Sequence, residues 1–165
     1  MVYGADVPKH WRICLCQYAR VIDIMFQQDF RFLPAPFRLG DHLLDCQHEG
    51  LFECMDALKK LSGDPSAAYK CNEIMSELTG RLAQHFDYEE ALMKKVGLKG
   101  DMFDQHVAAH TQIMDEISHI HLTSITGGYG AVDALLPSVS KWVLNHLMKY
   151  DLSLKPLIED ANRRA

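Results

Sequence analysis

Four long amphipathic segments, each bounded by short turn signals, leave this chain few possible folds. The turn signals are rich in Pro and Gly: "LPAP" (33–36), "GDP" (63–65), "GLKG" (97–100) and "TGGYG" (126–130). They delimit segments 38–62, 65–96, 101–123 and 131–162. Each is longer than about 20 residues, which as a helix would span roughly 30 Å. Apolar residues recur at steps of three and four, so we expect an all-α, antiparallel up-down four-helix bundle.

Local signals support helix starts at the second and third segments. Asp64 precedes Pro65, which is typical of an N-cap followed by proline at the first helical position. Asp101 follows Gly100 directly after the "GLKG" turn. No alternating β pattern and no internal repeat is present, so the bundle should contain helices alone.

Polar residues interrupt the apolar stripe of every segment. Those in phase are His48 in the first, His85 and Glu89 in the second, His106 and His110 in the third, and His146 in the fourth. The other histidines among the nine, His10, His42, His119 and His121, lie off the stripes. A buried ionised carboxylate must be paired, protonated or bound to metal. A hydrogen-bonded polar core would require a large, fully satisfied network, whereas metal satisfies all these groups at once, so we expect a metal centre.

The fourth segment changes phase after His146. The apolar positions Leu154 and Ile158 follow a new phase that includes Asp151. Five residues separate His146 from Asp151, which on a regular helix places the two side chains well apart around the axis. We therefore predict a distortion between them, of the one-residue π-bulge type, that returns Asp151 to the core.

The candidate ligand set exceeds what one tetrahedral zinc ion needs. Five imidazoles with two carboxylates suit two metal ions bridged by the carboxylates. Combined imidazole and carboxylate ligation favours iron, with manganese or zinc as possible substitutes.

The ordered motifs resemble the hemerythrin family. They are "GDHLLDCQH" (40–48), "HFDYEE" (85–90), "HVAAH" (106–110) and "WVLNHLMKYD" (142–151), and the resemblance extends from about residue 37 to 160. It implies a non-haem di-iron centre with carboxylate and hydroxo or oxo bridges. One iron would take His106, His110 and His146, and the other would take His48 and His85. Glu89 and Asp151 would bridge, and the iron with two histidines would keep a position open for O₂.

Further roles follow from position relative to these ligands. An apolar O₂ pocket is expected from residues within a turn of them: Leu51, Phe86, Trp142, Val143 and Leu147. Asp45, Gln47 and Glu90 are candidates for orienting the imidazoles, with a solvated surface position as the alternative for each. Tyr150, one turn after His146, should fill space beside the metals or hydrogen-bond to the centre.

Residues 1–36 differ in character from the bundle, which we expect to occupy 37–165. Trp11, Leu15, Tyr18, Ile22 and Met25 fall at helical spacing within this extension. It should form an extra N-terminal helix that packs on its own bundle or, alternatively, pairs with a partner or a second copy. The familiar tryptophan before the first bundle helix is absent, with Phe37 as the nearest substitute.

Composition limits the partners and the compartment. The net charge of −5 does not favour nucleic acid or an anionic membrane surface. No apolar run is long enough to span a bilayer. The short run between Arg12 and Arg20 is followed by no clear cleavage site, which does not fit a secretory signal. The five cysteines are odd in number and fit no disulfide framework, which favours reduced thiols. A cytoplasmic location is therefore expected.

Three classes of function remain open. Reversible O₂ binding for delivery, storage or sensing leads, and such a protein is not an enzyme. A di-iron oxidase, or an enzyme that handles peroxide or NO at the same centre, is the alternative. Ferritin-like oxidases need two Glu-x-x-His motifs, and this chain has one, Glu116-x-x-His119, off the core stripe. An interaction module with a structural metal is the third class, and an open coordination position would argue against it.

Overall fold

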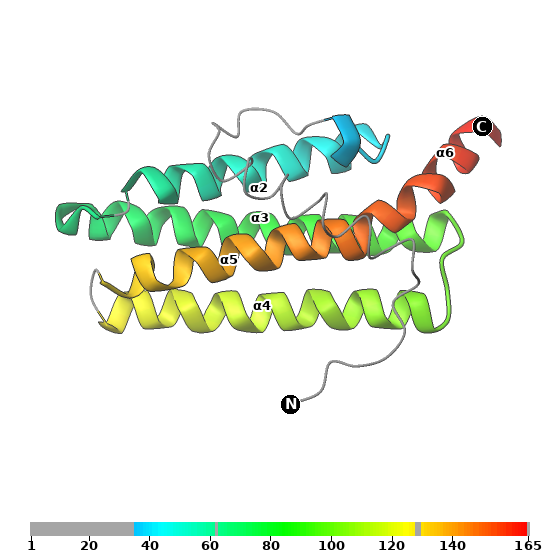
Figure 1. The fold of residues 1–165 in the computed structure, drawn as a ribbon. Helices are drawn as coiled ribbons and strands as arrows, with labels where there is room; N and C mark the ends of the chain where they lie inside the picture. Colours follow the sequence, from blue (N-terminus) through cyan, green and yellow to red (C-terminus); the bar gives the residue numbers. More distant parts are fainter. Residues whose placement is uncertain (1–34, 62, 128–129, 165) are drawn as a thin grey trace, which may run out of the picture. The chain divides into compact units, whose positions relative to one another are not determined.

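The computed structural model describes residues 35–61, 63–127 and 130–164. They belong to one compact unit, Arg31–Ala165. The expected extension 1–36 lies outside the described residues except for its last two, so its helix and its role stay predictions. Elements are named as in Figure 1.

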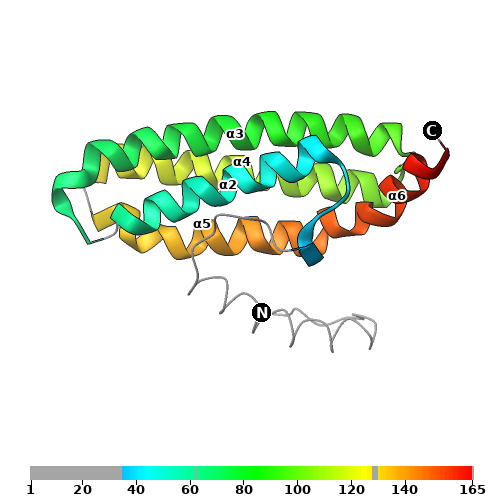
Figure 2. The same ribbon diagram turned by 90° about the horizontal axis from the view of Figure 1, so that it is seen from above.

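Four long helices lie side by side in Figures 1 and 2 and form the expected four-helix bundle. They are α2 (His42–Leu61), α3 (Ala68–Lys95), α4 (Asp101–Gly127) and α5 (Gly130–Lys149). Each packs on the next along the chain, and α2 also contacts α5, which closes the bundle. The described residues include no β-strand. Within the same residues, no helix has both the length and the apolar character that crossing a membrane requires.

The helix ends follow from local capping. The Asp41 side chain accepts the backbone N–H of Leu44 at 3.0 Å and so caps α2. Asp64 caps as predicted, but it opens a short 3-10 turn, η2 (Pro65–Ala67), ahead of α3. Helix α4 begins at Asp101 as expected.

A glycine ends α3. Gly97 has a φ of +86°, a left-handed conformation that other residues adopt at a cost. The N–H of Leu98 donates to the Met93 carbonyl at 2.9 Å, and the N–H of Gly97 donates to the Lys94 carbonyl at 3.2 Å. This pair of hydrogen bonds is a Schellman motif, which satisfies the last carbonyls of the helix and turns the chain toward α4.

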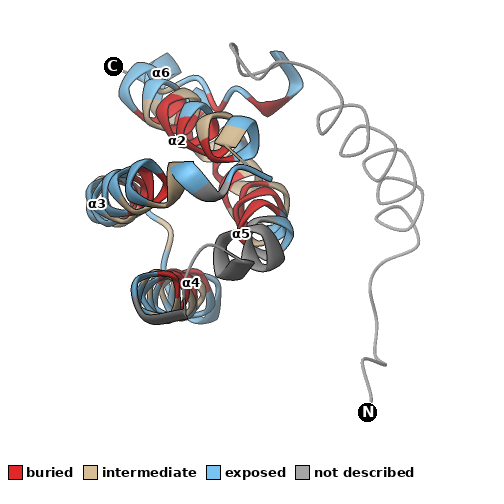
Figure 3. Cartoon of the chain, turned by 90° about the vertical axis from the view of Figure 1, so that its left-hand side faces the viewer, coloured by how far each residue is buried: buried red, intermediate tan, exposed pale blue. Residues whose placement is uncertain are grey.

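The predicted core stripes face the space that the four helices enclose (Figure 3). The side chains in phase with the stripes are buried in α2, α3 and α4, apart from Val96 and Phe103, which are partly exposed. The predicted stripe of the fourth segment begins with Val132, Leu135, Val139, Trp142 and His146. Val139 and His146 are buried and Trp142 is partly exposed, whereas Val132 and Leu135 fall outside the part of the chain whose side chains are described.

The fourth segment is not one helix. Helix α5 ends at Lys149, and a 3-10 turn, η3 (Asp151–Leu154), leads into α6 (Lys155–Arg164). The predicted distortion between His146 and Asp151 is therefore confirmed, but its π-bulge form is wrong. Instead the α-helix ends at Lys149, and after Tyr150 the tighter 3-10 turn brings Asp151, Leu154 and then Ile158 to the core.

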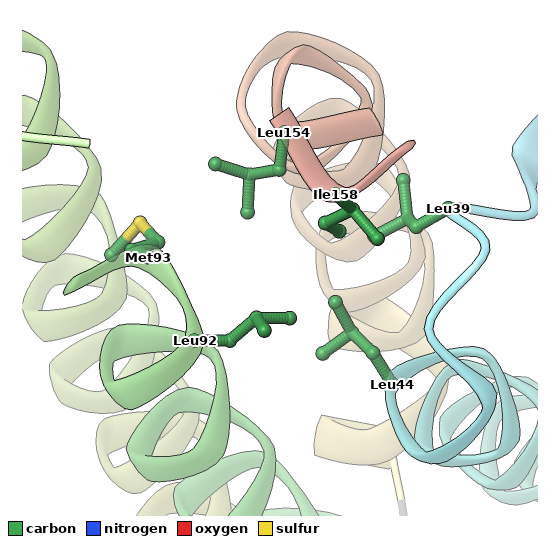
Figure 4. Packing of buried hydrophobic residues seen from close by; sticks show 6 residues of the cluster. All are labelled: Leu39, Leu44, Leu92, Met93, Leu154 and Ile158. Atoms are coloured by element: carbon green, nitrogen blue, oxygen red, sulfur yellow. The ribbon is translucent and has the colours of Figure 1, made fainter. Parts of the chain in front are cut away.

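A cluster of buried apolar side chains fixes this last segment to the bundle (Figure 4). Leu154 comes from η3 and Ile158 from α6. They pack against residues of the segment before α2, of α2 and of α3: Leu39, Leu44, Leu92 and Met93. Burial of a large apolar side chain contributes about 1.5–3 kcal/mol to the free energy of folding. The cluster therefore stabilises the position of η3 against the bundle.

We expect Leu44→Ala to destabilise the metal-free protein by roughly 2–5 kcal/mol, because it leaves a cavity in this cluster. The neighbouring Leu43 is 49% exposed, whereas Leu44 is fully buried. Leu43→Ala is thus a matched control that should cost less than about 0.5 kcal/mol. Urea denaturation measures both, and equal losses would contradict this view of the cluster.

Candidate metal centre

The structure brings all seven sequence-predicted ligands together inside the bundle. His48 comes from α2, His85 and Glu89 from α3, His106 and His110 from α4, His146 from α5 and Asp151 from η3. None of these side chains is more than 5% exposed. The two pairs on α3 and α4 are each spaced i, i+4, so both members point to one helix face.

These side chains form two groups. Within each group, the potential ligand atoms all lie within 4.8 Å of one another. We call Glu89 with His106, His110 and His146 the three-histidine group, and Asp151 with His48 and His85 the two-histidine group. The histidines divide between the groups in the way that the sequence resemblance implies. One carboxylate belongs to each group.

Asp151 spans both groups. Its Oδ2 lies 3.1 Å from Nε2 of His48, while its Oδ1 lies 3.2 Å from Nε2 of His106 and 3.0 Å from Nε2 of His146. The two oxygens of one carboxylate therefore face different groups. This is the arrangement that a carboxylate bridging two metal ions requires.

Glu89 also lies between the groups, but through one oxygen. Its Oε2 is 3.1 Å from Nε2 of His110, 3.5 Å from Nε2 of His106 and 3.7 Å from Nε2 of His85. Its Oε1 is buried without a hydrogen-bond partner among the described residues. A buried carboxylate oxygen left without a partner costs free energy, so the site lacks a group that would satisfy it.

The donor set fits metal better than it fits a closed hydrogen-bond network. Nε2 of His106 and Nε2 of His146 face each other at 3.1 Å, although both also face Asp151 Oδ1. The Nε2 atoms of five imidazoles converge on two carboxylates, and mutual hydrogen bonds leave the inner Glu89 oxygen unpaired. Imidazole nitrogens and carboxylate oxygens are together the ligands that iron, manganese and zinc accept.

Burial and the neighbouring charges shift the pKa values of two histidines in opposite directions. Burial opposes the charged form of His106, but hydrogen bonds to Asp151 and Glu89 outweigh it and raise the pKa of His106 to about 9. Burial, together with the His48 charge, lowers the pKa of His85 to about 4. The site therefore holds positive charge beside the carboxylates, and metal binding has to displace it.

The same contacts keep both carboxylates ionised. Burial works against the charged form of Asp151, yet the His146 charge and hydrogen bonds from His106, His146 and His48 hold its pKa well below the usual range. Burial and the Asp151 charge oppose ionisation of Glu89, and hydrogen bonds from His106 and His110 nevertheless lower its pKa. Two ionised carboxylates in a dry core attract cations strongly.

Two of the three candidate orienting residues contact an imidazole. Oε1 of Glu90 lies 3.0 Å from Nδ1 of His110, and Oε1 of Gln47 lies 3.4 Å from Nδ1 of His85. Such contacts fix the tautomer so that Nε2 is left for metal. Asp45 does not contact a histidine. It is buried, and it accepts the backbone N–H groups of Leu39 and Gly40 at 2.7 and 3.2 Å.

A small cavity lies against the two-histidine group. Its volume is about 10 Å³, at the lower limit for a single water-sized molecule. His48, His85, His146 and Asp151 line it together with apolar side chains: Leu51, Phe52, Leu82, Phe86, Ile113, Val143 and Leu147. Of the expected pocket residues, Trp142 is not in this lining and is partly exposed.

Sequence reasoning missed three of the lining residues. Leu82 and Ile113 lie three positions from His85 and His110 on the very stripes that were identified, and Phe52 lies four positions after His48. All three lie within one helical turn of a ligand, so helical spacing alone places them beside the centre.

The remaining described histidines and cysteines lie apart from the centre. His42 and His119 are exposed, and His121 contacts Ser76 at 3.3 Å. Among the described residues no disulfide joins Cys46, Cys54 or Cys71, and burial raises the pKa of Cys54 to about 11. His10, Cys14 and Cys16 lie outside the described residues.

Comparison with known proteins agrees with this geometry. Residues 39–158 match the sequence model of the hemerythrin HHE cation binding domain. The chain is 25% identical over 122 residues to a bacteriohemerythrin of Campylobacter jejuni, an alignment that covers 74% of this chain and 90% of the relative. It is 24% identical over 119 residues to a myohemerythrin of Riftia pachyptila, covering 72% of this chain and 86% of the relative. The family match spans most of the chain, and the chain belongs to the hemerythrin family.

Proposed function

We propose that this protein binds O₂ reversibly at a non-haem di-iron centre. The observation that carries the proposal is that the cavity does not adjoin the two groups equally. A carboxylate lies in each group, but the cavity adjoins both histidines of the two-histidine group and only His146 of the other three, with neither His106 nor His110 in its lining. A ligand site beside one metal position is what O₂ binding requires, whereas a purely structural metal site is closed. This favours O₂ binding over an interaction module with a structural metal.

Each residue has a role in this proposal. His106, His110 and His146 would hold one iron, His48 and His85 would hold the other, and Glu89 and Asp151 would bridge them, with a hydroxo or oxo bridge as the remaining ligand. Two ferrous ions would supply the electrons that O₂ needs to bind. Gln47 and Glu90 would keep the imidazoles of His85 and His110 in the tautomer that presents Nε2.

The cavity wall supplies the other requirement, which is exclusion of water. Leu51, Phe52, Phe86, Val143 and Leu147 surround the space with apolar atoms. O₂ is small and apolar, whereas anions and water lose hydration on entering such a space. The wall thereby favours reversible binding over irreversible oxidation.

The alternative of a di-iron oxidase of the ferritin-like class receives no support from Glu116-x-x-His119. His119 is exposed, and Glu116 accepts a hydrogen bond from Gln112 at 2.7 Å on the outside of α4. Enzymatic handling of peroxide or NO would use the same centre, so an experiment must distinguish it from reversible O₂ binding. A role in delivery, storage or sensing, a cytoplasmic location, and a partner contact through residues 1–36 remain parts of the proposal.

Asp151→Asn tests the bridging role. The amide cannot place two anionic oxygens between the groups, so we expect the metal content to fall from about two ions per chain to one or fewer. Asp45→Asn changes another buried carboxyl group, one that accepts only backbone N–H groups, and it should leave the metal content unchanged. Elemental analysis of the purified proteins measures both, and an unchanged content in Asp151→Asn contradicts the bridge.

Cycles of air and inert gas test the function itself. We expect the anaerobically reduced, iron-loaded protein to develop an optical band in air that disappears on deoxygenation, over several cycles. Irreversible oxidation in the first cycle would shift the assignment to redox enzymology. Failure to bind iron would leave the seven residues as a polar core.

Val143→Phe tests the cavity. Val143 lines it from α5, and a phenyl ring there would fill the space. We expect lower O₂ affinity at an unchanged iron content, with overpacking costing about 1–3 kcal/mol of stability. Ala83→Phe adds a phenyl ring at an exposed position of α3 and is the control for the added side chain. Wild-type affinity in Val143→Phe, or an equal loss in both variants, would contradict the assignment.

A further inference from the structure

Tyr150 contacts the centre without offering it a ligand. Its ring centroid lies 5.1 Å from that of His106 at an interplanar angle of 27°, and 5.1 Å from that of His146 at 32°. The side chain is partly exposed, while both imidazoles are buried. The ring thus forms an outer layer over two members of the three-histidine group.

Phe86 covers the third member. Its ring stacks on His110 with centroids 4.0 Å apart at 15°, and it also approaches His146 at 5.6 Å. Each imidazole of the three-histidine group therefore has an aromatic ring against it. Phe86 is buried and lines the cavity. Tyr150 is partly exposed and does not line the cavity.

We propose that Tyr150 is a positioning residue that seals the three-histidine group against solvent and keeps metal from leaving on that side. This inference rests on the proposed di-iron function. The two groups then differ in access as well as in ligands. The cavity adjoins the two-histidine group and, of the three-histidine group, only His146. Tyr150 covers His106 and His146 without lining the cavity.

The hydroxyl of Tyr150 is directed away from the ligands. Nζ of Lys149, an exposed residue, donates to the phenol oxygen at 2.9 Å and lies 4.6 Å from the centroid of the same ring. The ammonium group therefore holds the phenol at the surface through a hydrogen bond and a cation–π contact. The ring face is the part that covers the imidazoles, so phenylalanine should replace tyrosine with little effect.

The helix break holds the ring in this place. Tyr150 follows His146 by four residues, and its N–H donates to the His146 carbonyl at 2.8 Å, which retains the last α-helical turn. Residues four apart on a helix lie one above the other, with side chains leaning toward the N-terminus, which brings the phenol ring over His146. Beyond this point the chain leaves the α-helix, and the N–H of Ser153 donates to the Tyr150 carbonyl at 2.9 Å.

The rate of iron loss to an excess of a ferrous chelator, measured anaerobically on the loaded protein, tests the seal. We expect Tyr150→Ala to lose iron roughly 10-fold faster than the wild type, a size typical for residues that support metal ligands. Tyr150→Phe should match the wild type. Tyr69→Ala removes an 83% exposed tyrosine from α3 and should also leave the rate unchanged.

A second control separates sealing from general loss of stability. Leu58 is fully buried in α2, ten residues or about 15 Å along the helix from His48. Leu58→Ala should destabilise the metal-free protein, as followed by urea denaturation, without accelerating iron loss to the same extent as Tyr150→Ala.

Three results would overturn the inference. They are a wild-type rate in Tyr150→Ala, a rate in Tyr150→Phe as fast as in Tyr150→Ala, and equal acceleration in Leu58→Ala. Each can occur in a protein that holds two irons and binds O₂ reversibly, so the proposed function would stand. A wild-type protein that retains no iron would instead overturn the proposed function and the seal together.

Discussion

The placement of the Asp151 carboxylate between two sets of imidazoles is the interaction on which the rest of this structure depends. A carboxylate that is 1% exposed is tolerated only where cationic groups or metal neutralise it. Its two oxygens face histidines from three different helices, α2, α4 and α5. Removing this carboxylate would take away the acceptor that faces Nε2 of His48 and Nε2 of His146, because Glu89 approaches His85, His106 and His110 instead.

The break in the fourth helix is the structural cost of that placement. A continuous helix would carry residue 151 about 140° around the axis from His146. The 3-10 turn corrects this, and the apolar cluster around Leu154 and Ile158 stabilises the corrected path. The break also sets Tyr150 beside His106 and His146. Ligand geometry, packing of α6 and cover of the three-histidine group therefore depend on the same few residues.

Much of the arrangement could be predicted from sequence because the pattern repeats with helical period. Stripes such as Leu44, His48 and Leu51 identify both the helix and its buried face, and the i, i+4 pairs follow from that. The type of distortion before Asp151 could not be predicted, since a π-bulge and a 3-10 turn both restore the phase. Trp142 was placed by proximity along the chain, whereas the cavity depends on which neighbours from three other helices fill the space. Asp45 looked like an orienting residue but binds backbone N–H groups before α2.

The most direct test of the central claim is a crystal structure of the iron-loaded protein with anomalous data collected at the iron edge. The account predicts two anomalous peaks inside the bundle, one among His106, His110 and His146 and one beside His48 and His85. Asp151 should contact both. A single peak, or peaks outside this cluster, would contradict a di-iron centre built from the two groups.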